Sequence, residues 1–427
     1  MGGRTLVSSG EVAAAEEGPR PRLWGRFHTF DSLRERNFRW FWLGMLGSFA
    51  AMQMQILARG WLVVDTLHGS ELDLGIVASS FALPVLLFSL FGGAVTDRVE
   101  KRKLLIFTQG SIGLVTLGIA LLIVTDKVLL WHIIVSSLVT GTIFAFNMPG
   151  RQSMVTELVG PKRLPNAVAL TSAGMNLSRV GAPALAGVLM GVIGVGGVYF
   201  LIVGCYAFVV LSLLTLPARI ETQATSRNSL LGDLKDGLSY VRRNSQVSNL
   251  LILAFAPIVF AMSYQALMPV FAKDILGVGS SGLGFLMGAV GVGALFGTLG
   301  LASLFDFQRK GPLMIALLLI FGAALILFAF STSLYLSLAA LFLVGLGSMG
   351  YTALNNTLIL SNTDPQMRGR VISMYMMTWG LMPLGLLPAS AVAEAIGAPG
   401  AVTIGAGLLI VSTIAVVLLR PQIRRLK

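Results

Sequence analysis

Twelve long apolar stretches with few charged residues dominate this sequence and limit the folds that it can adopt. A helix needs about 20 apolar residues to cross roughly 30 Å of hydrocarbon. The stretches lack the period-two alternation of a barrel wall, so each is predicted to be a helix, and the chain to be an all-α integral membrane protein. The expected spans are 39–65, 73–96, 104–125, 129–149, 167–190, 193–217, 247–272, 281–304, 312–331, 333–361, 370–393 and 399–419.

The composition supports this class and excludes several others. Apolar residues make up 55% of the 427 residues and charged residues 12%, whereas soluble domains are about 25% charged. The single cysteine, Cys205, rules out a disulfide-stapled domain, and the three histidines, His28, His68 and His132, are too widely spaced to suggest a metal site. Since the sequence has no nucleotide-binding loop, nucleophile elbow or catalytic pair of carboxylates, we expect neither an enzyme nor a bound cofactor.

The positions of the basic residues predict the orientation of the chain. Of the 31 lysines and arginines, 27 fall in the two terminal segments and in alternate connections, whereas Lys127 and Lys273 alone fall in the other connections. Cytoplasmic loops carry the excess of basic residues, so both termini are expected to be cytoplasmic. The net charge of +12 is then a topology signal that also attracts anionic membrane lipid. It leaves no soluble basic surface for nucleic acid.

Six helices, a polar connection and six more helices make a two-part plan. In the connection, Leu230, Leu231, Leu234, Leu238 and Val241 recur at helical spacing, which predicts an amphipathic helix against the inner face or a solvated linker helix. The expected segments are a retained cytoplasmic tail at 1–38 with an interfacial helix from Arg26, a six-helix bundle at 39–217, the linker at 218–246, a second bundle at 247–419 and a cytoplasmic tail at 420–427.

The run Gly92-Gly93-Ala-Val-Thr-Asp97-Arg98-Val-Glu-Lys101-Arg102-Lys103 resembles the loop between helices 2 and 3 of the major facilitator superfamily. Together with Gly60-Trp61, Pro149-Gly-Arg151-Gln152 and Arg368-Gly-Arg370, it is similar to the bacterial exporter branch of the enterobactin exporter and related drug-efflux proteins. The resemblance covers about Arg34 to Leu419 and implies two pseudo-symmetric six-helix bundles. Weak internal matches agree with this, since Asp97 is repeated as Asp306 and Pro183-Ala184 as Pro388-Ala389.

The resemblance also implies a cytoplasmic gate. In the superfamily the acidic residue of this loop faces helix 11, which places Asp97 near Arg370, and Arg98, Arg102 and Glu157 would complete a charge cluster that holds the outward-facing state. Alternatively, these charges only fix the topology. The second-half match is expected to be weaker because Phe307 follows Asp306. The predicted gate residues are Gly93, Asp97, Arg98, Arg102, Glu157, Asp306 and Arg370.

Ionisable residues inside a membrane span are costly and usually mark function. Arg179 is expected near the middle of helix 5, where helix packing competes with contact to substrate, and Arg59 in the outer half of helix 1, where it lines the cavity or extends outward. The polar or aromatic residues expected to line a substrate cavity, each of which could instead form an interhelical hydrogen bond, are Gln53, Gln55, Arg59, Asn147, Asn176, Arg179, Tyr264, Gln265, Asn355, Asn356 and Trp379.

Proton coupling and the direction of substrate transport are predicted chiefly from the resemblance. The segment with Gly181, Pro183 and Gly187 resembles the antiporter segment of helix 5, although Ala182 replaces the usual glycine before the proline. Asp65 is the candidate for proton coupling, with plain solvation as the alternative, and Asp97 and Glu157 are indirect candidates.

The resulting prediction is a monomeric secondary transporter of the bacterial inner membrane. It would export a small amphipathic compound, drug-like or siderophore-like, by proton antiport and alternating access. Because buried acids are scarce, an anionic or zwitterionic substrate is favoured. A lipid flippase, an ion-coupled uptake symporter and a non-transporting sensor of the same fold stay open.

Overall fold

The computed structural model describes residue 2 and residues 32–96, 98–217, 230–303, 309–420 and 422–423. These residues are nearly all helical, and no strand occurs among them. Several predicted features lie outside the described residues: the N-terminal tail to residue 31 with the start of its interfacial helix, Asp97, Asp306 and linker residues 218–229. The backbones of Gly93 and Trp379 are helical, and the Trp379 side chain is also outside the description.

The first half consists of five elements. Helix α1 (Arg36–Trp61) continues into a π-helical turn, η2 (Leu62–Thr66), followed by α2 (Glu71–Thr96) and α3 (Lys101–Val124). The element α4 (Leu130–Leu214) runs over 85 residues, but it is interrupted at Gly160 (φ 66°) and Gly194 (φ 71°). Glycine adopts this left-handed conformation without a steric penalty. The two breaks divide α4 into segments 130–159, 161–193 and 195–214.

The second half has the same plan after the linker helix α5 (Leu230–Arg243). Its first crossing is assembled from α6 (Ser245–Ala256), η3 (Pro257–Ala261), α7 (Tyr264–Val270) and η4 (Phe271–Ile275). The remaining elements are α8 (Gly279–Ser303), α9 (Lys310–Ala329), α10 (Leu334–Ser361), α11 (Arg368–Trp379), α12 (Met382–Ile396) and α13 (Ala398–Leu419).

Eleven helices in the described part of the chain are long and apolar enough to cross a membrane. One of them, Lys162–Leu214, has 53 residues, about 80 Å at 1.5 Å per residue and more than twice the thickness of the hydrocarbon core. The break at Gly194 divides it into two crossings, which confirms the predicted twelve. One predicted end is wrong: helix 4 continues to Gly160 rather than ending at residue 149, because only there does the backbone leave the helical conformation.

Glycines let helices approach closely inside each bundle. A Cβ on Gly92 of α2 would lie 2.2 Å from the carbonyl oxygen of Ala145 in α4, and one on Gly141 equally close to that of Phe81. In the second bundle, a Cβ on Gly293 of α8 would lie 1.9 Å from a carbonyl oxygen in α10. These contacts are the close backbone approach that small residues allow between membrane helices.

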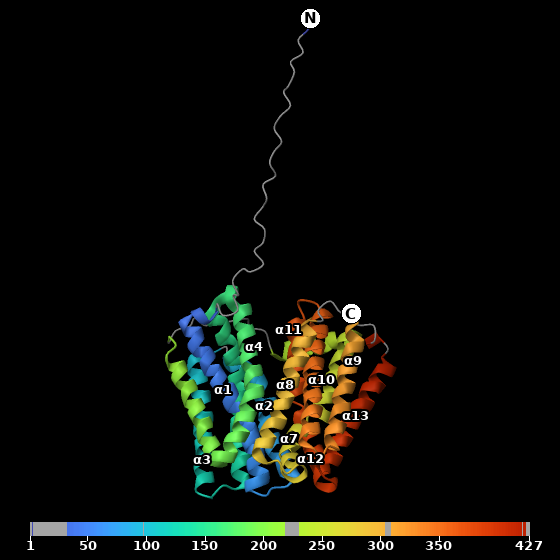
Figure 1. Ribbon diagram of the computed structural model, residues 1–427. Helices are drawn as coiled ribbons and strands as arrows, with labels where there is room; N and C mark the ends of the chain where they lie inside the picture. The colour runs from blue at the N-terminus through green and yellow to red at the C-terminus, as the bar shows by residue number, and fades with distance from the viewer. Residues whose placement is uncertain are drawn as a thin grey trace.

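The two bundles meet along two seams. The middle segment of α4 packs against α8, where Gly187 and Gly284 are almost in backbone contact, and α2 packs against α12, where Gly75 lies against Ser390. In Figure 1 the bundles stand side by side, their ribbons diverge toward the end that carries both termini, and they come together at the opposite end.

The linker helix α5 packs against the second bundle. A Cβ on Gly237 would lie 3.2 Å from the sulfur of Met374 in α11, and Val241 is buried. After α5, Asn244 caps α6 through its side-chain oxygen and donates through Nδ2 to the carbonyl of Asn362 (3.3 Å). The predicted linker helix is therefore present and attached to the second bundle.

Candidate functional site

A chain of hydrogen-bonded polar side chains surrounds Arg151 inside the first bundle. The guanidinium, on a residue that is only 7% exposed, donates to Ser48 Oγ and lies 5.1 Å from the centroid of the Phe49 ring. Ser48 donates to Gln109 Oε1 (3.3 Å), and Gln109 Nε2 donates to Asn147 Oδ1 (3.4 Å). These partners are neutral, and no carboxylate among the described residues pairs with Arg151. The first bundle thus holds a buried cation.

Sequence reasoning missed Arg151 as a site residue. It was counted with the inner connection because helix 4 was expected to end two residues earlier, whereas α4 continues for nine residues beyond it. The signal was present in the sequence, since Met154 and Val155 follow at helical spacing and both are buried.

Gln55 belongs to the interior of the same bundle. Its Nε2 donates to Thr116 Oγ1 (3.2 Å), and its Oε1 accepts from the Tyr206 hydroxyl (3.3 Å). Gln53, on another face of α1, is half-buried. The contacts of Gln55 are those of an interhelical hydrogen bond, and its assignment to a substrate cavity stays a prediction.

Arg59 lies about 9 Å from Asp65 along the helix axis, toward the interior. It interacts with the Tyr199 hydroxyl, and its guanidinium lies 5.9 Å from the centroid of the Phe81 ring. It therefore contacts α2 and the last segment of α4 rather than extending outward. Aromatic faces attract a guanidinium, and no carboxylate of the part of the chain that the structure describes pairs with this second cation.

Arg179 joins the two bundles. It lies on the middle segment of α4, and its Nη1 is 3.2 Å from the sulfur of Met349 in α10. Its own carbonyl oxygen packs against Gly291 of α8. Asn176, one turn earlier, is half-buried. Of the two predicted roles of Arg179, packing between helices is observed directly, and contact with substrate stays a prediction.

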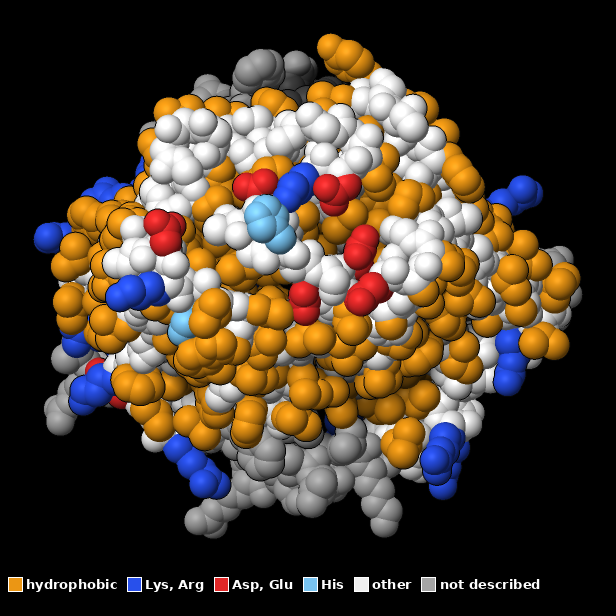
Figure 2. Space-filling view, turned by 90° about the horizontal axis from the view of Figure 1, so that it is seen from below, with side chains coloured by type: hydrophobic (Ala, Val, Ile, Leu, Met, Phe, Trp, Pro, Cys, Tyr) orange, Lys and Arg blue, Asp and Glu red, His pale blue; other side chains and the backbone are white. Residues whose placement is uncertain are grey.

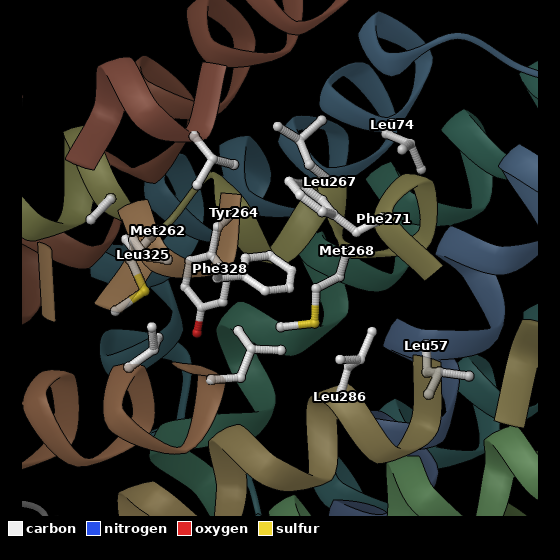
Figure 3. Close-up of a cluster of buried hydrophobic side chains, with 14 of the residues drawn as sticks. Leu57, Leu74, Met262, Tyr264, Leu267, Met268, Phe271, Leu286, Leu325 and Phe328 are labelled. Carbon is white, nitrogen blue, oxygen red and sulfur yellow. The ribbon is translucent and has the colours of Figure 1, made fainter. Parts of the chain in front are cut away.

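The second bundle contributes an aromatic and amide surface. The buried Tyr264 stacks edge-on against Phe321, with ring centroids 6.4 Å apart, and Figure 3 shows it among the buried side chains of this region. Gln265 is exposed, and its Nε2 lies 3.5 Å from the Tyr264 hydroxyl. The same Nε2 donates to the sulfur of Met262 (3.6 Å), and contact of Gln265 with a substrate stays a prediction.

Several buried polar groups of the second bundle have no hydrogen-bond partner among the described residues. These groups are the side-chain Nδ2 and Oδ1 of Asn355 and of Asn249, the Oδ1 of Asn356 and the Tyr351 hydroxyl. Burying such a group unsatisfied costs about 1–3 kcal/mol. A cavity bounded by Ser348 and Tyr351 has room for about one water molecule. Asn355 and Asn356 are thus the predicted cavity residues with the most unused hydrogen-bonding capacity.

At the end that carries the termini, the predicted gate charges find other partners. Glu157 pairs with Lys101, and Arg102 donates to the carbonyls of Leu213 (3.0 Å) and Leu214 (2.9 Å). These contacts stay within the first bundle. Arg98 is exposed and Arg370, in α11, is half-buried. In the described residues Arg102 and Glu157 thus make separate contacts, and the predicted charge cluster of a gate, with Gly93 and Arg370, stays a prediction.

At the opposite end, two π-helical turns bring the bundles together. Lys273 in η4 donates to the carbonyl of Val64 in η2 (2.9 Å), and its Nζ is 3.6 Å from Asp65. Ser70 donates to Glu394 of α12 (3.1 Å). Figure 2 shows acidic side chains gathered near the centre of this face, with a basic side chain and a histidine among them. Asp65 is thus in a contact between bundles, whereas the sequence suggested only coupling or solvation.

The helix 5 segment lies on the seam between the bundles. Ser280 and Ser281 donate to the carbonyl of Gly187 (3.2 and 3.4 Å), and the carbonyl of Pro183 packs against Gly284. Gly181 is exposed. The proline and glycine predicted from the antiporter resemblance therefore lie in a tight contact with α8.

Two pseudo-symmetric bundles, tight glycine seams and polar groups between them define a multi-pass membrane transporter of the major facilitator fold. The chain belongs to the family of transmembrane secretion effectors, whose profile matches residues 27–426. Similar proteins include the staphyloferrin A transporter of Staphylococcus aureus, 26% identical over 83% of this chain and 86% of that one. The enterobactin exporter EntS of Escherichia coli is 26% identical over 77% and 76%. The chain is a transporter and not an enzyme.

Solved structures show the same fold. The nucleoside transporter NupG superposes with a TM-score of 0.75 at 14% identity, covering 90% of this chain and 98% of that one. An inward-facing bacterial homologue of the lysosomal transporter Spinster gives a TM-score of 0.67 at 15% identity, over 94% and 96%. At these identities the likeness concerns the fold alone.

Proposed function

We propose that this protein exports a small amphipathic organic compound bearing at least one negative charge from the bacterial cytoplasm, in exchange for protons. Its relatives include a staphyloferrin A transporter and an enterobactin exporter, which supports transport of a small organic molecule and, through the second relative, its export. Both termini then lie in the cytoplasm, in agreement with the distribution of basic residues. The bundles rock about the seams of Gly187 and Gly75 to expose the site alternately to either side.

One observation carries the charge preference. Arg59, Arg151 and Arg179 lie within membrane crossings, whereas the described carboxylates lie outside the crossings or near their ends. A cation would meet only like charge there, while an anion would compensate a charge that is costly to bury. Arg179 lies at the contact between bundles, so it is the residue we expect to meet the anionic group. Gln265, Asn355 and Asn356 supply neutral hydrogen bonds.

The apolar part of the substrate is expected to lie against the second bundle. Tyr264 and Met262 belong to the large buried apolar cluster there, and Met349 already contacts Arg179. Methionine side chains adapt to irregular apolar shapes. The site therefore combines a fixed cation with a deformable apolar wall, which favours siderophore-like and drug-like anions.

Binding of charged and neutral probes tests the charge preference. Arg179→Gln and Arg59→Gln are expected to weaken binding of an amphipathic carboxylate by about tenfold or more, which corresponds to about 1.4 kcal/mol, and to leave its amide analogue unaffected. Arg39→Gln, which removes an exposed arginine of α1, is the matched control. Equal losses for carboxylate and amide, or tight binding of a lipophilic cation by the parent protein, would contradict the proposal. Isothermal titration calorimetry on protein in nanodiscs gives these affinities.

A further inference from the structure

The first crossing of each half ends on the same irregular turn. In η2 the N–H of Leu67 bonds to the carbonyl of Leu62 (3.0 Å), and in η4 the N–H of Leu276 bonds to that of Phe271 (2.9 Å). The next backbone hydrogen bond is matched in the same way: the N–H of Gly69 bonds to the carbonyl of Val63, and the N–H of Val278 bonds to the carbonyl of Ala272. All four pairs of equivalent residues are 209 positions apart. The turns are therefore pseudo-symmetric, and π turns are frequent at functional sites.

A helix that ends leaves its last carbonyl groups without partners in the helix. The carbonyls of Leu62 and Val63 are satisfied by the turn itself, and the carbonyl of Val64 accepts from Lys273 of the other bundle. The ammonium group also lies at the negative end of the helix dipole. Lys273 thus caps the first crossing in trans, and the backbone carbonyl at 2.9 Å is closer than the Asp65 carboxylate at 3.6 Å.

The cap exists on one side only. By the 209-residue spacing, the residue equivalent to Lys273 is Val64, whose side chain has no donor. The first bundle therefore offers a carbonyl and the second bundle offers the cation. The lysine side chain is 28% exposed, so the bond is shielded in part from water and screened less than a surface ion pair.

Apolar contacts continue inward from this bond. Gly60 of α1 packs against Pro269 of α7, and Figure 3 shows Leu57 and Leu74 of the first bundle in the same buried cluster as Leu267 and Phe271 of the second. Separation of the bundles at this end must break the Lys273 bond before it exposes this apolar layer. The bond is therefore placed where it can set the balance between closed and open states.

We propose that Lys273 is a positioning residue of the transport cycle, which holds the end opposite the termini closed by capping the Val64 carbonyl of the other bundle. The Asp65 carboxylate is secondary to this contact. The inference rests on the transporter fold and does not depend on the substrate or its charge. Its failure would accordingly leave the proposed export function untouched.

Spin-label distances across the closed end test the proposal. In a Cys205→Ser background, labels at Leu129→Cys and Ile396→Cys report on the two bundles, since both positions are exposed at this end. Lys273→Met is expected to raise the ratio of the long-distance to the short-distance population by about tenfold, because it removes a charged hydrogen bond. Asp65→Asn, which keeps the carbonyl contact, should change the ratio less than threefold.

Lys127→Met is the matched control, because Lys127 is the other lysine expected at this end and lies in the loop between α3 and α4. Lys273→Arg keeps the positive charge and the hydrogen-bond donors, so it should show the short distance of the parent protein. That result would exclude misfolding as the cause of the change in Lys273→Met. The same distances in Lys273→Met and the parent would overturn the proposal. So would an equal opening by Asp65→Asn, which would make the contact an ordinary ion pair. If Lys273→Met does not fold, Lys273→Gln provides the same comparison.

Discussion

At the scale of single residues, Arg151 sets the chemistry of the first bundle. An isolated buried charge is costly in an apolar interior, and neutral hydrogen-bond acceptors and an aromatic face offset part of that cost. Ser48 occupies the key position because it accepts from Arg151 and donates to Gln109. Its hydroxyl therefore links the cation to the amide of the neighbouring helix α3.

Removing that hydroxyl is expected to destabilise the protein. Ser48→Ala leaves a donor of Arg151 and the Gln109 oxygen without their partner, which should lower the free energy of unfolding by about 1–3 kcal/mol. Ser89→Ala is the control, since Ser89 is exposed and bonds only to a carbonyl of its own helix. Thermal unfolding in detergent measures both. An unchanged melting temperature for Ser48→Ala would mean that water already satisfies Arg151.

At the scale of helices, the sequence predicted most spans to within a few residues because hydropathy and chain length alone determine them. The end of helix 4 was placed wrongly because a proline, a glycine and an arginine at 149–151 look like a loop. The structure continues the helix through them, and the arginine is buried against Ser48 and Phe49. The π turns could not be predicted, since their signal is a backbone hydrogen-bond shift; only the 209-residue repeat hints at them.

Helix packing gives a direct prediction for α8. A methyl group added in Gly293→Ala would lie 1.9 Å from the carbonyl oxygen of Phe342, so the backbones of α8 and α10 must separate. Overpacking of this kind costs about 1–3 kcal/mol. Gly407→Ala in α13, which has open space around it, should instead be neutral or stabilise by about 0.5–1 kcal/mol through helix propensity. Gly293→Ala is therefore expected to lower the melting temperature, and Gly407→Ala to leave it unchanged or raise it.

At the scale of the whole molecule, the fold was predictable because it follows from twelve apolar spans and an internal repeat. The contacts between the bundles were not, because they depend on which helix faces meet. Arg179 illustrates this limit: its depth could be computed from the sequence, but its contact with Met349 of the other bundle could not. Lys273 was noted only as a rare basic residue of an outer loop, and its bond to Val64 appears only in three dimensions.

Substrate-driven proton flux in proteoliposomes tests the proposed exchange of an exported anionic compound for protons. The vesicles contain a pH-sensitive dye, and amphipathic carboxylates are added outside. Entry of the carboxylate should drive protons out and raise the internal pH, whereas cationic analogues of equal size should leave the internal pH unchanged. Asp65→Asn should abolish the pH change and retain substrate binding. Proton flux with the cations alone, or no flux with any compound, would contradict the proposed anion–proton exchange.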